Sequence, residues 1–120
     1  MGKLYWKRIY EPAETQDGFR ILVDRLWPRG IAKASASLGD WAKDIAPSSE
    51  LRKAYHAGEI DYGYFSAMYA KELAENQASQ KFLDTIKAKL QVGNVTLLYA
   101  VKEPAKSHIP TLQEFIKKRL

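Results

Sequence analysis

The sequence of 120 residues contains no cysteine, only two histidines and no long apolar run, and each absence narrows what the protein can do. Without cysteine there are no disulfides, no thiolate nucleophile and no cysteine-bound zinc. His56 and His108 lie far apart, and neither stands at metal-ligand spacing to other ligands, so we predict no metal site. No apolar run approaches the ~20 residues of a membrane span. The first residues also lack the apolar core of a signal peptide. We therefore expect a cytoplasmic protein with no membrane association.

Sequence patterns that hold cofactors are also missing. There is neither a G-x-G-x-x-G nor a Walker-type loop, and no serine stands in a nucleophile-elbow pattern, so we predict no cofactor. The net charge of +5 permits attraction to nucleic acid or small anions, but the 19 basic residues are spread along the chain. The densest run, Lys117-Lys118-Arg119, ends a predicted helix, where cations favour the negative end of the helix dipole. Whether the protein is an enzyme stays open at this point.

The residues that are present predict one α/β domain over residues 1–120. Strand patterns cover residues 3–10, 19–26 and 95–101. Helical patterns cover residues 38–46, 50–57, 61–76, 79–93 and 109–120. The helix over residues 50–57 has a possible cap in Ser48 or Ser49, the one over 61–76 in Asp61, and the one over 79–93 in Ser79. Gly93-Asn94 is suited to end the last of these three at positive φ. We expect a compact fold with a small, mostly parallel sheet flanked by helices.

The relation between the first two strands stays open. The loop between them is shorter than most parallel crossovers need, so they are either an antiparallel pair or joined by an unusually short crossover. If strands 19–26 and 95–101 are parallel, the loops that follow them lie at one edge of the sheet, where open α/β sheets bind ligands. The first loop carries Asp24, Arg25, Trp27 and Arg29, and the second carries Tyr99, Lys102, Glu103 and His108.

One long block of the sequence is familiar. It runs Asp17-Gly18-Phe19-Arg20-Ile21-Leu22-Val23-Asp24-Arg25-Leu26-Trp27-Pro28-Arg29-Gly30, and it resembles the hallmark of the domain-of-unknown-function 488 family, in its short YeaO-like branch. Segments 8–12, 46–52 and 95–100 are also similar to that branch. The resemblance implies a compact α/β domain without an established activity. Relatives often have Asn-His-Ala where this chain has Ser107-His108-Ile109. Longer members carry cysteines in this region, so any thiol chemistry of theirs cannot operate here.

Arg25 and Arg29 are candidates for binding an anion. They stand four residues apart across a strand end and a proline turn, and two guanidinium groups hold a phosphate or carboxylate through bidentate hydrogen bonds. Gly30 lets the backbone approach a ligand closely. Tyr99 and Lys102 are candidates to line the same pocket from the other loop. The alternative is that Arg25 pairs with a neighbouring carboxylate or with a helix C-terminus.

Three further residues have both a functional and a structural interpretation. Trp27 either stacks on a ligand ring or fills the core beside the turn. Asp24 is either a general base or, as we favour, an orienter of Arg25 or a turn cap. His108 either transfers protons or hydrogen-bonds the loop that opens the last helix. His56, near a helix end, is predicted to be a surface residue.

These residues support a site for a small anionic ligand, phosphate-bearing molecules included, with Asp24 and His108 as candidate catalytic groups. The alternative is a nucleic-acid-associated or regulatory binding module, which we do not favour because no helix-turn-helix recognition helix is recognisable. A third hypothesis is a protein–protein module that uses exposed aromatic residues such as Tyr62 or Tyr64. Substrate, reaction class and oligomeric state are not decided by the sequence.

Overall fold

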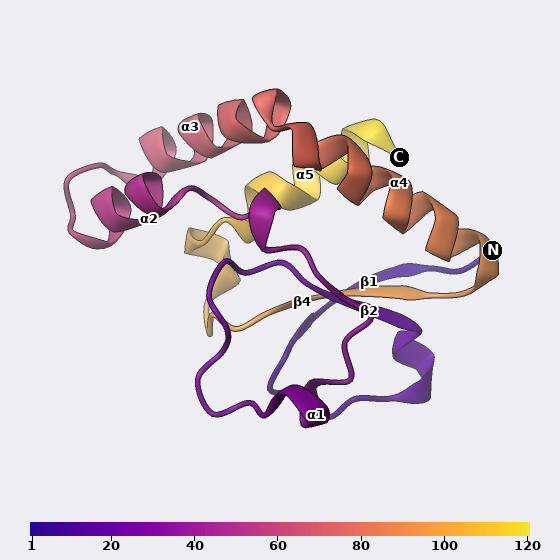
Figure 1. Ribbon diagram of the computed structural model, residues 1–120. Helices are drawn as coiled ribbons and strands as arrows, with labels where there is room; N and C mark the ends of the chain where they lie inside the picture. The colour runs from indigo at the N-terminus through magenta and orange to yellow at the C-terminus, as the bar shows by residue number, and fades with distance from the viewer.

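The computed structural model describes all residues, 1–120, as an α/β domain of four strands and five α-helices (Figure 1). None of its helices has the length and apolar character needed to cross a membrane. The elements follow the chain as β1 (Leu4–Arg8), β2 (Phe19–Leu22), α1 (Lys33–Ala36), β3 (Asp40–Trp41), α2 (Ser49–His56), α3 (Tyr62–Glu75), α4 (Gln77–Val92), β4 (Val95–Tyr99) and α5 (Ile109–Arg119), with 3-10 turns at Thr15–Asp17, Lys43–Ile45 and Pro104–Lys106.

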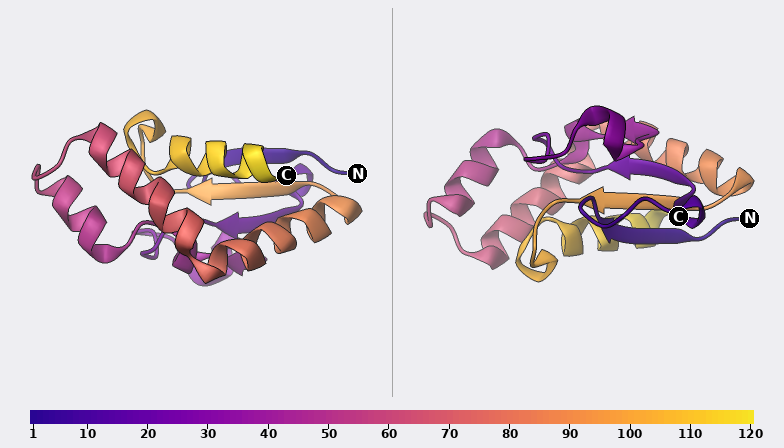
Figure 2. Two further views of the ribbon diagram at one scale, coloured as in Figure 1. Left: turned by 90° about the horizontal axis from the view of Figure 1, so that it is seen from above. Right: turned by 90° about the horizontal axis from the view of Figure 1, so that it is seen from below.

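The four strands form one parallel sheet in the order β1-β4-β2-β3. β4 is a central strand, and its Val95 pairs with Leu4 on one side and with Phe19 on the other. The first two strands therefore do not pair with each other, and the short-crossover alternative is correct. The prediction of a small, mostly parallel sheet flanked by helices is confirmed. All four carboxyl ends lie at one edge, the side on which α2 and the start of α3 extend beyond the sheet (Figure 2).

Successive residues of the central strands point to opposite faces of the sheet. Ile21 and Leu97 belong to the main core, which also takes side chains from α3, α4 and α5. Leu22 and Leu98 point the other way and form a smaller core with Ala36 of α1. Figure 1 shows the same division, with α1 on one side of the sheet and α2 to α5 on the other. Both faces of the central strands are thus covered, as their continuous apolar sequence predicts.

Two of the predicted helix caps are confirmed. The Ser48 hydroxyl accepts a hydrogen bond from the Leu51 amide at the start of α2 (3.2 Å). The Asp61 carboxylate accepts one from the Tyr64 amide at the start of α3 (2.8 Å). Both side chains satisfy amides that have no partner within the helix. The helix that follows Pro47 therefore begins where the sequence predicts.

The prediction that Ser79 caps α4 is wrong. The cap is Asn76, whose side-chain oxygen accepts from the Ala78 amide (2.9 Å). Ser79 lies inside the helix, where its hydroxyl donates to the Leu73 carbonyl (2.7 Å). The end of the helix also differs from the prediction, because Gly93 has a φ of 170° and is extended rather than left-handed.

The helix predicted over residues 38–46 is also wrong. The segment forms the short strand β3 and a turn of 3-10 helix. Its helix-like apolar spacing has a different cause, because the segment passes the edge of the sheet and contributes to both cores. Leu38 and Trp41 pack on the smaller core, whereas Ala42 and Ile45 belong with the main core.

A buried ionic network lies on the α1 side of the sheet. Arg20 is 5% exposed, pairs with the Asp17 carboxylate and donates to the Ala36 carbonyl. Lys7 pairs with Asp17 (3.1 Å) and with Glu14 (3.0 Å). Burial opposes ionisation of Asp17, but hydrogen bonds from the Glu14 amide, Lys7 and Arg20 lower its pKa below the ordinary value. Burial likewise opposes ionisation of Lys7, and its hydrogen bonds to Glu14 and Asp17 raise its pKa.

Candidate functional site

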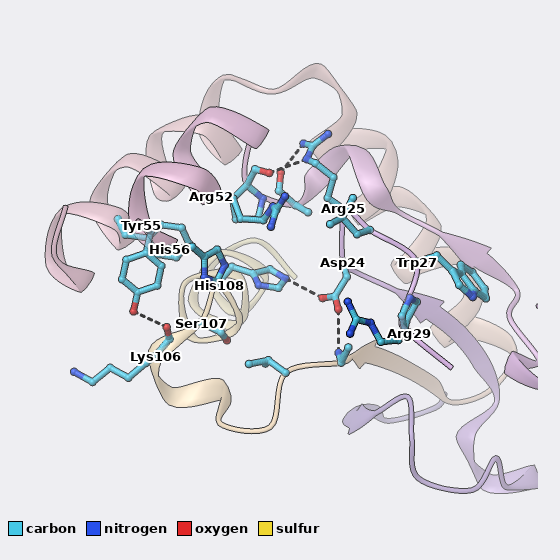
Figure 3. Close-up of a pocket in the computed structure, with 17 residues that line it drawn as sticks. Asp24, Arg25, Trp27, Arg29, Arg52, Tyr55, His56, Lys106, Ser107 and His108 are labelled. Carbon is cyan, nitrogen blue, oxygen red and sulfur yellow. Dashed lines mark hydrogen bonds and ion pairs between the residues drawn. The ribbon is translucent and has the colours of Figure 1, made fainter. Parts of the chain in front are cut away.

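A cavity of about 340 Å³ opens where β2 and β4 end. It lies between the loop after β2, the turn before α2, α2 itself and the loop between β4 and α5 (Figure 3). Because β2 and β4 are parallel neighbours, the two strand-end loops share one edge of the sheet, as expected. The volume is within the range of small-molecule sites, roughly 300–1,000 Å³.

The charge of the cavity wall is strongly positive. Four cationic side chains line it, and Asp24 is its only carboxylate. None of the four cations takes part in an ion pair with a carboxylate. The four are Arg25, Arg29, Arg52 and Lys106. The cavity wall therefore carries a net positive charge, which attracts anions.

Asp24 connects the ends of β2 and β4. Strand pairing stops after the Val23 amide, which donates to the Leu98 carbonyl (3.0 Å). At the next position, the Asp24 Oδ2 accepts from the Ala100 amide (3.0 Å) in place of a backbone carbonyl. The other oxygen, Oδ1, is buried and accepts no hydrogen bond. One oxygen of this carboxylate is thus structural, and the other is buried in the cavity wall, 3.4 Å from His108 Nε2.

His108 lies at the start of α5 and lines the same cavity. Its Nε2 lies 3.0 Å from the Val23 carbonyl and 3.4 Å from Asp24 Oδ1. Because a carbonyl only accepts, Nε2 carries the hydrogen and donates to Val23. The ring also packs edge-on against Tyr69. Burial raises the pKa of that tyrosine well above its ordinary value, so its hydroxyl remains a neutral donor to the Ile45 carbonyl. These contacts favour the structural interpretation of His108.

Arg25 lines the cavity, but most of its guanidinium is engaged by the backbone. Its Nε donates to the Pro47 carbonyl (2.8 Å), and one terminal nitrogen donates to the Ala46 carbonyl (3.0 Å). These bonds hold the turn before α2 against the loop after β2, as Figure 3 shows. The sequence-based alternatives paired this side chain with Asp24 or a helix end. The structure supports the second alternative, because Ala46 and Pro47 follow directly on the 3-10 helix Lys43–Ile45.

Trp27 and Arg29 follow Asp24 on the same loop, but only the Trp27 side chain is held by contacts within the protein. The Trp27 indole donates to the Ile31 carbonyl (2.6 Å) and packs edge-on against Trp41. It belongs to the smaller core, which favours the core-filling interpretation. The Arg29 side chain is exposed, and its guanidinium makes no hydrogen bond or ion pair. Arg29 is thus a predicted anion ligand on the cavity wall whose guanidinium has no partner within the protein.

Tyr99 and Lys102 do not line the cavity. Tyr99 packs against the main core, and Lys102 is exposed. The second loop contributes Lys106 and Ser107 in their place, together with His108. The prediction thus selected the correct loop but placed the contacts too close to the strand, because the 3-10 turn Pro104–Lys106 folds back toward α2.

Two tyrosine hydroxyls hold this second loop in position. Tyr55 of α2 donates to the Lys106 carbonyl (2.8 Å), and Tyr62 of α3 donates to the Ser107 carbonyl (2.8 Å). The Tyr55 ring also stacks on Phe65, with ring centroids 4.4 Å apart. The loop that closes one side of the cavity is therefore attached to two helices through its backbone.

The residues of α2 were missed by the sequence-based prediction. Arg52, Tyr55 and His56 all line the cavity, and His56 is also exposed, as its prediction as a surface residue requires. The i, i+4 spacing of Arg52 and His56 on a capped helix places both on one face, and this is the only signal that was available. That this face turns toward the strand ends depends on how α2 packs, which the sequence does not show. No group of three or more His, Asp or Glu side chains is arranged to hold a metal ion.

Comparison with known proteins places the chain among relatives of similar length. A family model described as the inactive DUF488-N3 subclade matches residues 3–120. The uncharacterized protein YeaO of Escherichia coli (strain K12) is 46% identical over 111 residues, which cover 92% of this chain and 94% of the relative. The uncharacterized protein Rv3073c of Mycobacterium tuberculosis (strain H37Rv) is 37% identical over 112 residues, covering 93% and 92%. No solved structure matches the chain.

Proposed function

The chain belongs to the DUF488 family, in the subclade described as inactive DUF488-N3, and we propose that it binds a small anionic molecule in the cavity at the ends of β2 and β4. The observation that carries the proposal is the set of four cations on the cavity wall that have no carboxylate partner. In a partly enclosed site, such charges attract anions more strongly than they do on an open surface.

The proposal is for binding without catalysis. Asp24 and His108, the two candidates for proton transfer, are both engaged by the backbone, Asp24 through the Ala100 amide and His108 through the Val23 carbonyl. A general base needs a lone pair aimed at the proton that it removes, and the unengaged oxygen of Asp24 is buried beside His108, 3.4 Å from its Nε2. The description of the subclade as inactive supports the same view. The absence of cysteine is compatible with the cytoplasm, which we propose as its location.

Titration of the protein with inorganic phosphate, followed by calorimetry and thermal unfolding, tests the proposal. Phosphate at a hundredfold excess over Kd stabilises the protein by about 2.7 kcal/mol if it binds only the native state. Arg52→Gln and Arg29→Gln each weaken phosphate binding about tenfold, because each removes a charge-assisted hydrogen bond. Lys102→Gln is the matched control, since it removes a cation near the same edge but outside the cavity.

The proposal fails if neither phosphate nor other small anions change the melting temperature. It also fails if Lys102→Gln weakens phosphate binding as much as Arg52→Gln does. Salt-sensitive binding of DNA or RNA that is unchanged in Arg29→Gln and Arg52→Gln would support the nucleic-acid alternative instead.

A further inference from the structure

Buried polar atoms without partners are concentrated at this cavity. Three buried side-chain atoms in the chain lack a hydrogen bond, and two of them belong to residues of the cavity wall. These two are Asp24 Oδ1 and Arg52 Nε. Buried polar groups in folded proteins are nearly always paired, so an unpaired acceptor and an unpaired donor at one cavity indicate a ligand that supplies both partners.

The two atoms require opposite chemistry from that ligand. Arg52 Nε is a donor and needs an acceptor, which an anionic group supplies. An ionised carboxylate cannot donate, so Asp24 Oδ1 needs a hydrogen-bond donor. His108 Nε2 lies 3.4 Å away but already donates to the Val23 carbonyl. The ligand therefore carries an anionic group and, elsewhere, a hydrogen-bond donor such as a hydroxyl.

The cavity also has room and apolar surface for a larger body. The cavity volume is about 340 Å³, whereas a water molecule occupies roughly 30 Å³. A free phosphate ion, which is only a few times larger than water, would therefore leave most of the cavity unfilled. Leu26 and Val101 line the cavity although they are 59% and 39% exposed. Phe65 and Pro47 add apolar surface deeper in the wall. Large exposed apolar side chains beside a cavity indicate that an apolar part of the ligand covers them.

We infer that the ligand is a nucleoside monophosphate, an inference that rests on the proposed function and specifies its ligand. A phosphomonoester carries close to two negative charges, which match the unpaired cations Arg29 and Arg52 better than a single carboxylate does. A ribose hydroxyl donates to Asp24 Oδ1. The base covers the apolar wall beside Leu26. Asp24 is thereby the residue that selects the ribonucleotide over an analogue without ribose hydroxyls.

Calorimetry with three probes tests the inference on the unmodified protein. The probes are adenosine 5′-monophosphate, its 2′,3′-dideoxy analogue and inorganic phosphate. We expect the ribonucleotide to bind about tenfold more tightly than the dideoxy analogue, which lacks the donor for Asp24. We expect inorganic phosphate to bind most weakly, because it leaves the apolar wall uncovered.

The variant Asp24→Asn separates the two oxygens of the carboxylate. Its amide oxygen still accepts from the Ala100 amide, while its NH₂ group replaces the acceptor Oδ1 with a donor. The preference for the ribonucleotide over the dideoxy analogue disappears in this variant and persists in the exposed control Asp84→Asn. If Asp24→Asn does not fold, the two nucleotides decide the question on the unmodified protein, because they change only the ligand.

The outcomes distinguish this inference from the proposed function. If both nucleotides bind equally and Arg52→Gln weakens both, anion binding stands and the role of Asp24 is overturned. If the ribonucleotide binds no more tightly than phosphate does, the nucleoside part of the inference is wrong. If none of the three probes binds, the proposed function fails and the inference fails with it.

Discussion

The Asp24 carboxylate accepts a hydrogen bond from the Ala100 amide at the point where β2 and β4 stop pairing through their backbones. The side chain takes the place that the next backbone carbonyl would have in a longer strand. This substitution lets the chain turn away at Pro28 without leaving the Ala100 amide unpaired. It also fixes the second carboxylate oxygen at the cavity wall. The same residue thus ends the strand and lines the cavity.

Replacing Asp24 tests this structural role. Asp24→Ala leaves the half-buried Ala100 amide without an acceptor, and we expect the free energy of unfolding to fall by about 1–3 kcal/mol. Asp24→Asn keeps an acceptor and should lose less. Urea unfolding measures both. The exposed Asp84 provides the control, because Asp84→Ala on α4 should change stability by no more than about 0.5 kcal/mol. Equal losses in Asp24→Ala and Asp84→Ala would contradict the role.

The tyrosine hydroxyls that hold the β4–α5 loop allow a second test. Tyr55→Phe and Tyr62→Phe each remove a hydrogen bond to this loop and keep the ring in place. We expect each to cost about 1 kcal/mol of stability and to speed amide hydrogen exchange in residues 104–107. Tyr64→Phe is the control, because the Tyr64 hydroxyl is exposed and makes no hydrogen bond within the protein. Unchanged exchange in the double variant would show that the loop is held by other contacts.

Much of the fold follows from local patterns in the sequence. The apolar runs of β2 and β4, and the capping residues Ser48 and Asp61, predict elements that the structure contains. The prediction failed where one segment serves two cores. Leu38 and Ile45 have helical spacing, yet they pack on opposite sides of the sheet. A periodic pattern indicates a face but does not show whether its residues share one element.

The candidate site was only partly predictable for a related reason. The rule for parallel strand ends depends only on strand order and direction. It selects five residues that line the cavity: Asp24, Arg25, Trp27, Arg29 and His108. Arg52 and Lys106 reach the cavity through the packing of α2 and of a 3-10 turn. That packing depends on contacts between residues distant in sequence, such as the bond from Tyr55 to the Lys106 carbonyl, which no local pattern specifies.

The ionic network around Asp17 predicts a dependence of stability on pH. The pKa of Asp17 is lowered by folding, so its ionised form stabilises the protein above the unfolded value of about 3.8, and this contribution is lost as the pH falls through the folded pKa. Asp17→Asn leaves the buried Arg20 without its carboxylate, and we expect a loss of about 3 kcal/mol at pH 7. Urea unfolding at pH 7 and pH 3 should show this difference shrinking at the lower pH.

A matched control for Asp17→Asn is Glu14→Gln. The Glu14 side chain is 66% exposed, so its ion pair with Lys7 is largely screened by water, and its loss should cost under about 1 kcal/mol at either pH. A difference between the Asp17 variant and the unmodified protein that stays constant from pH 7 to pH 3 would show that the carboxylate charge does not stabilise the fold.

Gly18 and Gly58 form a pair that separates backbone strain from steric conflict. Both have positive φ, 66° and 76°. A Cβ at Gly58 would meet nothing within 4 Å, whereas a Cβ at Gly18 would lie 2.1 Å from the Asn94 carbonyl oxygen.

Gly58→Ala should therefore cost only the conformational strain, about 1 kcal/mol. Gly18→Ala must also displace the backbone at Asn94, whose carbonyl accepts a hydrogen bond from the Phe19 amide at the start of β2. We therefore expect the free energy of unfolding to fall by about 3 kcal/mol or more. Thermal unfolding of both variants measures the difference. Similar losses would mean that the loop before β2 shifts without disturbing β4, and that the close approach of Gly18 to Asn94 is not needed for the pairing of the two strands.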